Sequence, residues 1–299
     1  MDRTSILINN YNNARFLAQC VDSALNQTIQ PGEIVVYDDG STDGSLELLK
    51  RYGSALTVLR GARGQSTPMA NQAVAIQNAF AVSKGDIIFL LDADDAFSAD
   101  KISSYLAAFN HSSKIIMVQA PMWKIDDSGQ ILGVEYDPRR HAKDYLKYIY
   151  ESNDINIYYP TSALAFRRSY LEKRFPLDFS DGRPLWPDGR LSLVAAHFGE
   201  IVTLDEPHTL WRRHPRSHTV ITKTSVYQQA KMNVRYYNAF CASRGWRPIY
   251  PWRSAQQRRR WLRHVCPQFF LDLYQAYIRR ATLPGKAFPS SGASEKETS

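Results

Sequence analysis

Three carboxylates stand at the end of an apolar run near residue 90. Residues 87–91 are five consecutive large apolar residues, and Asp92, Asp94 and Asp95 follow them almost without a break. Such a run predicts a strand buried on both faces, and ligands of open α/β sheets bind just beyond the carboxyl ends of these strands. Three acids this close raise one another's pKa, a cost that a bound divalent cation or a solvated turn removes. One reading is therefore a metal site; in the other, Asp94 and Asp95 form a turn and cap the helix near Ser98.

Two more polar turns follow predicted strands. Asn9 to Asn13 comes after a short apolar strand at residues 5–8, and Asp38-Asp39-Gly40-Ser41-Thr42-Asp43-Gly44 comes after a second strand at residues 33–37. Asn, Asp and Gly are typical of turns because they tolerate unusual backbone angles and cap helices. Polar residues thus stand at the ends of three predicted strands.

The remaining pattern alternates strands and helices, which predicts parallel βαβ units. The expected helices are residues 14–25, 45–52, 68–83, 100–110, 137–150, 189–198, 225–243 and 254–280, and the further strands are residues 55–59, 115–119, 162–166, 201–204 and 209–213. Asp126 to Gly129 predicts the turn of a hairpin. We expect an α/β fold.

The composition suits one large domain with an appendage. The chain has 299 residues, of which 44% are hydrophobic. No apolar run approaches the ~20 residues of a transmembrane helix, and the first residues do not resemble a secretory signal. We expect a cytoplasmic protein in which Cys20, Cys241 and Cys266 are buried thiols.

The net charge of +8 is concentrated in one segment. Between Pro207 and Leu271 there are thirteen Lys and Arg residues and no Asp or Glu, whereas the rest of the chain has 24 basic and 29 acidic residues. This distribution favours contact with an anionic lipid surface, a polyphosphate or nucleic acid.

The two acidic turns, read together with Tyr11-Asn12 after the first strand, closely resemble the family 2 glycosyltransferases with the GT-A fold. The resemblance covers residues 5 to about 214 and implies a mixed, mostly parallel sheet flanked by helices. We expect a catalytic domain at residues 1–220, with a nucleotide-sugar half (about 1–120) and an acceptor half (about 121–220). A basic aromatic helical extension (221–283) and a disordered tail (284–299) would follow.

The resemblance implies a binding site for the base of a nucleotide sugar. Tyr11 would stack on the base and Asp39 would hydrogen-bond it. Asn9 belongs to the same site, although Asn9-Asn10 replaces the Thr or Pro that the family usually has before the Tyr. Arg63, in the loop after the third strand, would contact base or phosphate; the alternative is a solvated arginine.

The resemblance also assigns the acidic run. Asp92 would lie near the ribose and Asp94 would bind Mn²⁺ or Mg²⁺, with Asp95 as the second candidate ligand. The physical chemistry agrees, because a departing nucleoside diphosphate needs its charge neutralised, and a hard cation held by carboxylates and phosphate oxygens does this as a Lewis acid.

A general base is needed to take the proton from the acceptor hydroxyl. The segment Trp186 to Leu191 resembles the family's element for this base and makes Asp188 the candidate, although Pro187 replaces the usual neighbouring acid. Asp178 and Asp181 are alternatives in the same loop, and Asp188 is also suited to cap its helix.

Downstream, the segment Trp211-Arg212-Arg213-His214 resembles the family's aromatic-Arg-x-His segment. In this reading Arg212 clamps a phosphate, and His214 binds the metal or a phosphate oxygen. The other reading is an exposed histidine in a basic loop.

These features predict an inverting, metal-dependent glycosyltransferase that moves a sugar from a nucleotide sugar, most simply a UDP sugar, to a hydroxyl of a saccharide or lipid-linked saccharide. Cell-surface polysaccharide or glycolipid synthesis is the expected setting, and a homodimer is compatible with it. One alternative is a nucleotidyltransferase, although the chain lacks a Gly-rich phosphate loop after the first strand. The other is a non-enzymatic nucleic-acid binding protein, which would leave both acidic turns unexplained.

The basic C-terminal segment predicts peripheral membrane association. Residues 252–263 mix tryptophan with arginine, and residues 269–277 supply an apolar stripe at helical spacing, so this helix can lie in a membrane interface. In the other reading the stripe packs on the catalytic domain or a second subunit.

Overall fold

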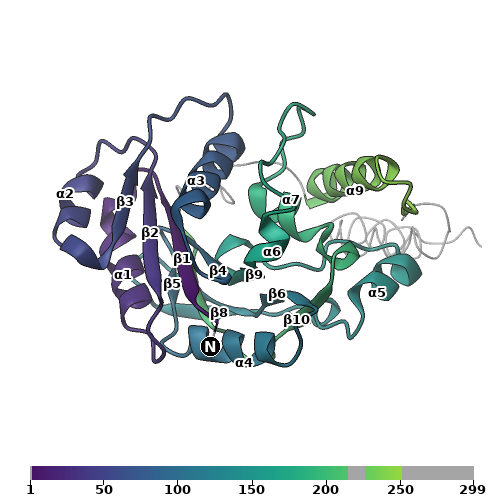
Figure 1. Cartoon of the computed structure of the whole chain (residues 1–299), viewed down its shortest axis with the longest axis horizontal. Helices are drawn as coiled ribbons and strands as arrows, with labels where there is room; N and C mark the ends of the chain where they lie inside the picture. The colour runs from purple at the N-terminus through teal and green to yellow at the C-terminus, as the bar shows by residue number, and fades with distance from the viewer. Residues whose placement is uncertain (1, 215–225, 251–299) are drawn as a thin grey trace, which may run out of the picture. The chain divides into compact units, whose positions relative to one another are not determined.

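The computed structural model of the protein describes residues 2–214 and 226–250 (Figure 1). The chain divides into two compact units, Met1–Pro251 and Trp252–Ser299, and all described elements belong to the first. The tail predicted at residues 284–299 lies outside the described residues, as does part of the predicted helical extension.

Parallel strands joined by helices form the first half of the unit, as the alternating pattern predicts. The strands are β1 (Thr4–Asn10), β2 (Glu33–Asp38), β3 (Thr57–Arg60) and β4 (Ile87–Asp92), and the connections contain α1 (Ala14–Leu25), α2 (Ser45–Lys50), the 3₁₀ turn η1 (Gly53–Ala55) and α3 (Pro68–Val82). Strand β1 lies between β2 and β4 in parallel register. Helix α3 begins where the sequence predicts, because Thr67 accepts a hydrogen bond from the Ala70 N–H and Pro68 occupies the first turn.

The sheet continues beyond β4 with strands of both directions. Strand β9 (Leu164–Arg167) runs antiparallel between β4 and β6 (Ile115–Gln119), and β10 (Glu200–Thr203) is parallel to β6. The seven-stranded order is β10-β6-β9-β4-β1-β2-β3, a mixed but mostly parallel sheet. Strand β9 starts two residues later than predicted, because the 3₁₀ turn η3 (Thr161–Ala163) precedes it; the short helix α6 (Arg168–Leu171) follows.

Both faces of the sheet are covered, which explains why β4 is apolar throughout. Successive side chains of a strand point to opposite faces. Ile88 and Leu90 join a core that includes residues of α3, whereas Ile87, Phe89 and Leu91 join a second core with residues of α1 and α4 (Lys101–Asn110). All five apolar side chains of β4, Ile87 to Leu91, are fully buried.

A second, four-stranded sheet lies beside the acidic turn. Its order is β5-β11-β7-β8, formed by β5 (Ala96–Phe97), β11 (Thr209–Arg212), β7 (Met122–Ile125) and β8 (Ile131–Glu135). The predicted hairpin is confirmed: β7 and β8 are antiparallel, and Asp126 Oδ1 in the turn accepts the N–H groups of Ser128 and Gln130 at 2.8 and 2.9 Å. The sequence did not predict strand β5. This strand directly follows the acidic turn and pairs with β11 in antiparallel register.

The helix predicted over residues 137–150 is two elements. The side chain of Asp137 caps the 3₁₀ turn η2 (Pro138–Arg140), and that of Asp144 caps α5 (Tyr145–Ser152). Each carboxylate accepts a backbone N–H at a new helix start, so the segment forms two separate elements.

The helix predicted over residues 189–198 is also divided. Helix α7 (Pro187–Ser192) starts two residues earlier, with proline in its first turn, and the 3₁₀ turn η4 (Ala195–His197) follows separately. The Ser192 hydroxyl donates to the Asp188 carbonyl at 2.7 Å, a local bond that competes with continued helix.

Helix α9 (Val226–Ala242) confirms the helix predicted over residues 225–243. Its Tyr236, Tyr237 and Cys241 side chains are buried against the domain, and Cys20 and Cys241 are free buried thiols. Among the described residues, no helix is both long enough and apolar enough to span a bilayer. The helix predicted over residues 254–280 and Cys266 lie outside the described part of the chain.

Candidate active site

The polar turns after β1, β2 and β4 meet at one edge of the sheet. Strand register pairs Asn10 with Asp38 and Asn9 with Asp92. The Asn10 amide donates to Asp38 Oδ2 at 2.7 Å, while Asp38 Oδ1 accepts the Ser41 N–H at 2.9 Å. Asp38 therefore holds the first two turns together. Its neighbour Asp39 instead pairs with Arg63, which covers the Tyr11 ring.

Asn12 and Asp43 complete the connection between these turns. Asn12 has φ of 52°, a left-handed conformation that Asn tolerates well, and its Oδ1 accepts the Thr42 N–H at 2.8 Å. Asp43 accepts the Ala14 N–H at the start of α1 at 2.8 Å. These bonds fix the backbone on either side of Tyr11.

Tyr11, Asp39 and Arg63 come together as a group. The guanidinium carbon of Arg63 lies 3.7 Å from the centre of the Tyr11 ring, and its Nη1 lies 3.4 Å from Asp39 Oδ2. Tyr11 is 38% exposed, whereas Asp39 is buried. Burial raises the pKa of Asp39, and the Arg63 charge opposes this shift. The group offers a ring face and a carboxylate to a planar ligand bearing N–H donors.

The acidic turn brings Asp92, Asp94 and Asp95 close together. One carboxylate oxygen from each lies within 4.8 Å of those of the other two. The N-cap residue of α4 is Asp100, so neither Asp94 nor Asp95 caps that helix. Asp94 Oδ2 lies 3.0 Å from Nε2 of His214. The three carboxylates offer oxygen donors of the kind that Mg²⁺ and Mn²⁺ prefer, and the His214 imidazole lies beside one of them, Asp94.

Burial and mutual repulsion both act on these acids. Burial, followed by the Asp94 charge, raises the pKa of Asp92 to about 7. Burial, then Asp94 and Asp92, also raise the pKa of Asp95 well above its usual range. A cation bound among the carboxylates would offset this repulsion.

Asp95 is more constrained than Asp94. Its Oδ2 accepts the Ser162 hydroxyl at 2.6 Å, and its Oδ1 accepts the Arg212 N–H at 2.8 Å. The side chain of Asp95 is 3% exposed. Both of its oxygens are thus already hydrogen-bonded, whereas Asp94 is partly open to solvent.

Gln72 and Asn9 support Asp92 from the side of β1 and α3. Gln72 Nε2 donates to Asp92 Oδ1 at 2.8 Å, and the Asn9 side chain also hydrogen-bonds this carboxylate. Gln72 Oε1 and Asn9 Oδ1 are buried and accept no hydrogen bond within the described chain. Sequence reasoning missed Gln72, because a glutamine within a helix gives no local signal of such a contact.

Arg212 connects three segments around the acidic turn. Its Nε donates to the Asp94 carbonyl at 2.9 Å, and its Nη1 donates to the carbonyls of Asp126 and Asp127 at 2.7 and 3.2 Å. Its Nη2 donates to Gln19 of α1. Four of the five guanidinium N–H groups are therefore used within the protein, which leaves one for a phosphate.

Asp188 lies near the acidic turn. It sits in the first turn of α7, where Oδ1 accepts the Gly189 N–H at 2.7 Å. Burial raises its pKa, while hydrogen bonds from Gly189 and Thr161 oppose the shift. Burial and Asp94 are the main causes of the raised pKa of Asp92, and the Asp188 charge adds to it.

The two alternatives to Asp188 are differently placed. Asp181 makes a bidentate ion pair with Arg190, with distances of 2.8 and 3.0 Å. Burial acts to raise the pKa of Asp181, but the hydrogen bonds from Arg190 and Arg183 outweigh it and lower the pKa to about 2. The hydrogen bonds of Ser180 lower the pKa of the solvent-exposed Asp178. Both are weaker bases than Asp188.

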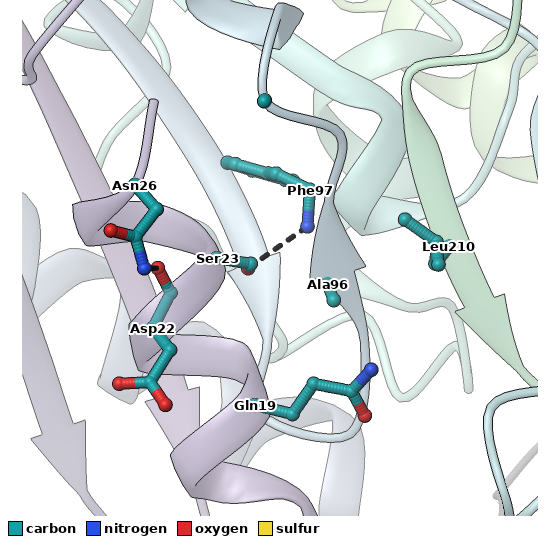
Figure 2. A pocket seen from close by; sticks show the side chains of 8 residues that line it. Gln19, Asp22, Ser23, Asn26, Ala96, Phe97 and Leu210 are labelled. Carbon is teal, nitrogen blue, oxygen red and sulfur yellow. Dashed lines mark hydrogen bonds between the residues drawn. The ribbon is translucent and has the colours of Figure 1, made fainter. Parts of the chain in front are cut away.

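A surface pocket of about 460 Å³ lies between α1 and β5 (Figure 2). It is lined mainly by polar residues of α1 and by Ala96, Phe97 and Leu210, and Ser23 accepts the Phe97 N–H at 3.0 Å. None of the predicted site residues lines this pocket.

A family model described as "Glycosyl transferase family 2" matches residues 5–175. An uncharacterized glycosyltransferase of Nostoc sp. is 30% identical over 257 residues, which are 82% of this chain and 77% of the relative. Chondroitin synthase of Pasteurella multocida is 34% identical over 143 residues, which are 48% of this chain but only 14% of the synthase. The family match favours glycosyl transfer over the nucleotidyltransferase and nucleic-acid binding alternatives.

Solved structures show the same fold at low identity. TarS of S. aureus in complex with UDP-GlcNAc has a TM-score of 0.58 and 15% identity, and the match covers 79% of this chain and 66% of that one. A mannosyltransferase from Pyrobaculum calidifontis in complex with GDP-Man and Mn²⁺ has a TM-score of 0.60 and 16% identity, covering 96% and 76%. The acidic turns, the seven-stranded sheet and the family match agree: the chain is a family 2 glycosyltransferase with the GT-A fold.

Proposed function

We propose that the protein is an inverting, metal-dependent transferase that uses a nucleotide sugar, most simply a UDP sugar. The observation that carries this proposal is the cluster of Asp92, Asp94 and Asp95 at the carboxyl end of β4, whose carboxylate oxygens lie within 4.8 Å of one another. A general base and a metal-binding turn are the two parts that a single displacement at the anomeric carbon requires.

The group of Tyr11, Asp39 and Arg63 is the proposed base site. A carboxylate beside an exposed ring suits a base that stacks and donates an N–H, as uracil does, and Asn9 supports the adjoining strand end. Arg63 now lies against both partners, so it would either move aside or cover the bound base. The S. aureus relative with UDP-GlcNAc and the Pyrobaculum relative with GDP-Man make the choice of base an experimental question.

Asp94 and His214 are the proposed metal ligands, because they face each other at 3.0 Å and Asp94 is partly exposed. When bound there, Mn²⁺ or Mg²⁺ would neutralise the leaving diphosphate. Asp92 would lie near the ribose. We propose that Asp95 and Arg212 hold the turn in place, since the oxygens of Asp95 and most N–H groups of Arg212 are already hydrogen-bonded within the protein.

Asp188 is the proposed general base. A raised pKa brings a carboxylate closer to the pH at which it accepts a proton from an acceptor hydroxyl. One displacement without an enzyme nucleophile gives inversion at the anomeric carbon. The relative named chondroitin synthase, of which the match covers only 14%, favours a saccharide acceptor. The proposed acceptor is a free or lipid-linked saccharide in cell-surface polysaccharide or glycolipid synthesis.

A panel of nucleotide sugars tests the proposal. The purified protein should release nucleoside diphosphate from one of UDP-glucose, UDP-galactose, UDP-GlcNAc and GDP-mannose, and only with Mn²⁺ or Mg²⁺ present. Adding EDTA should stop the reaction and restoring the metal should recover it. Metal-independent turnover would contradict the metal role, and turnover of the GDP sugar alone would contradict the choice of uracil.

We also propose that the basic segment beyond α9 brings the enzyme to an anionic membrane. Each basic residue near such a surface is worth about 1 kcal/mol, so several arginines suffice for reversible binding. The protein should sediment with anionic but not neutral liposomes at low salt, and should be released at high salt. Replacing Arg258, Arg259 and Arg260 with Ala should abolish sedimentation, whereas failure of the unmodified protein to sediment would exclude membrane binding.

A further inference from the structure

Ser162 bonds the acidic turn at two points. Its hydroxyl donates to Asp95 Oδ2 at 2.6 Å and accepts the Asp92 N–H at 3.0 Å. Ser162 is 1% exposed and belongs to η3, more than sixty residues away in the chain. One side chain therefore fixes both ends of the Asp92–Asp95 turn, with Asp94 between them.

The neighbouring residue, Thr161, bonds the proposed base. Its backbone N–H and its hydroxyl lie beside the carboxylate of Asp188, where they oppose the rise in pKa that burial causes. Thr161 is 4% exposed. Two adjacent side chains of one turn thus reach the two groups on which the proposed reaction depends.

The turn itself is anchored from beneath. The Ser162 carbonyl accepts hydrogen bonds from Lys101 Nζ at 3.0 Å and from Thr209 Oγ1 at 3.1 Å, and the Ala163 carbonyl accepts the Tyr105 hydroxyl at 2.7 Å. Lys101 is fully buried and makes no ion pair within 4 Å among the described residues. Its amine instead donates hydrogen bonds to Tyr105, to Thr209 and to the Ser162 carbonyl, so it ties this turn to α4 and β11.

The groups held by η3 repel one another. Asp92, Asp95 and Asp188 are three carboxylate residues grouped around this turn. Carboxylates of like charge separate unless the backbone that carries them is restrained. The hydrogen bonds of η3 supply that restraint on both sides.

We propose that η3 sets the spacing between the metal-binding turn and the general base, with Ser162 as the positioning residue of the turn and Thr161 as that of Asp188. This inference rests on the proposed function. Ser162 would act on the affinity for metal, and Thr161 would act on the rate of transfer.

The first measurement is Mn²⁺ binding to the full-length protein by titration calorimetry, with no sugar present. Replacement of Ser162 by Ala should weaken Mn²⁺ binding by about 10- to 100-fold, the usual effect of removing a group that orients a metal ligand. Ser162→Thr, which restores the hydroxyl, should recover most of the affinity. Thr161→Val should bind Mn²⁺ as the wild type does.

The second measurement is turnover of the best substrate of the nucleotide-sugar panel at saturating Mn²⁺. Thr161→Val should lower kcat by about tenfold with KM for the donor unchanged, because it removes a hydrogen bond to a charged group. Thr161→Ser should recover kcat. A merely structural role would not produce this separation of metal affinity from kcat.

Two matched controls lie at the opposite end of the sheet. The Ser5 hydroxyl donates to Glu33 at 2.6 Å and accepts the Gly85 N–H at 2.8 Å, the same chemistry as that of Ser162. Thr4 is buried and accepts the Gly32 N–H at 3.2 Å. Ser5→Ala and Thr4→Val should change the melting temperature without changing Mn²⁺ affinity or kcat.

The outcomes distinguish the positioning role of Ser162 from the proposed function of the protein. Wild-type Mn²⁺ affinity in Ser162→Ala, or equal losses in Ser162→Ala and Ser5→Ala, would overturn the positioning role while leaving the proposed function intact. A wild-type protein that binds Mn²⁺ but turns over no nucleotide sugar would overturn the proposed function, and the Mn²⁺ titrations of the Ser162 variants would still decide the role of Ser162.

Discussion

Replacing Asp188 with Asn should lower kcat for sugar transfer by about 10²- to 10⁴-fold, the usual contribution of a general base. The residues proposed to bind the nucleotide sugar are Tyr11, Asp39 and those of the acidic turn. Asp188 is not among them, so the dissociation constant of the nucleotide sugar should not change. Asn retains an oxygen that can accept the Gly189 N–H, now bonded at 2.7 Å, so the start of α7 should persist. Steady-state kinetics and donor titration of the variant measure both quantities.

The dependence of stability and of kcat on pH gives an independent check of the role of Asp188. Burial raises the pKa of Asp188, so the folded state binds its proton more tightly than the unfolded chain does, and this contribution to stability grows as the pH falls. At neutral pH the charged form is a cost, and Asp188→Asn should keep or raise the melting temperature. Wild-type kcat should fall as the pH drops through the raised pKa, because the protonated carboxyl accepts no proton.

Asp178→Asn is the control in the same loop. Asp178 is solvent-exposed and its neighbour Ser180 lowers its pKa, so its replacement should leave kcat and the melting temperature unchanged. If Asp188→Asn lost donor affinity and rate in equal measure, Asp188 would be a structural cap of α7.

The elements that carry the donor groups were predictable because their signals are local. The apolar run of β4 and the helical spacing of α1 each act within a few residues, and the structure confirms the elements that they predict. The second half was harder, because Asp137 and Asp144 each start a new element within one apparent helix. A capping side chain and a polar face look alike in a sequence.

The positions of the candidate site residues followed from motifs, but their partners did not. The strand-end turns placed Tyr11, Asp39 and Asp94 on one edge, since parallel strands end together. Contacts with Gln72, Ser162 and other distant residues depend on helix and turn placement, which no local pattern encodes. The structure therefore supplies the groups that orient the acids.

Arg212 shows the same limit within a motif. The aromatic-Arg-x-His segment predicts that Arg212 clamps a phosphate, and in the structure its Nε donates to the Asp94 carbonyl at 2.9 Å. Its hydrogen-bond partners, however, also include groups that lie 85 to 193 residues away in the chain. These are the carbonyls of Asp126 and Asp127 and the side chain of Gln19. A guanidinium that looks like a phosphate clamp in the sequence mainly joins β11 to α1 and the β7–β8 turn.

Replacing Asp94 with Asn should abolish most metal-dependent turnover, by at least about 10²-fold, because charge neutralisation by a metal contributes several kcal/mol and each 1.36 kcal/mol is a factor of ten in rate. Mn²⁺ binding measured by calorimetry should weaken in parallel. His214→Ala should act in the same direction, since its Nε2 lies 3.0 Å from Asp94 Oδ2.

The chain contains a matched carboxylate–histidine pair to serve as control. Asp100, only a few residues beyond the acidic turn, is largely exposed. Its Oδ1 lies 3.2 Å from Nδ1 of His208. Asp100→Asn removes the same charge from the same region without touching the Asp92–Asp95 turn, so Mn²⁺ affinity should stay at the wild-type value. Equal losses in both variants would attribute the effect to general electrostatics, whereas full metal-dependent turnover in Asp94→Asn would place the metal on other ligands.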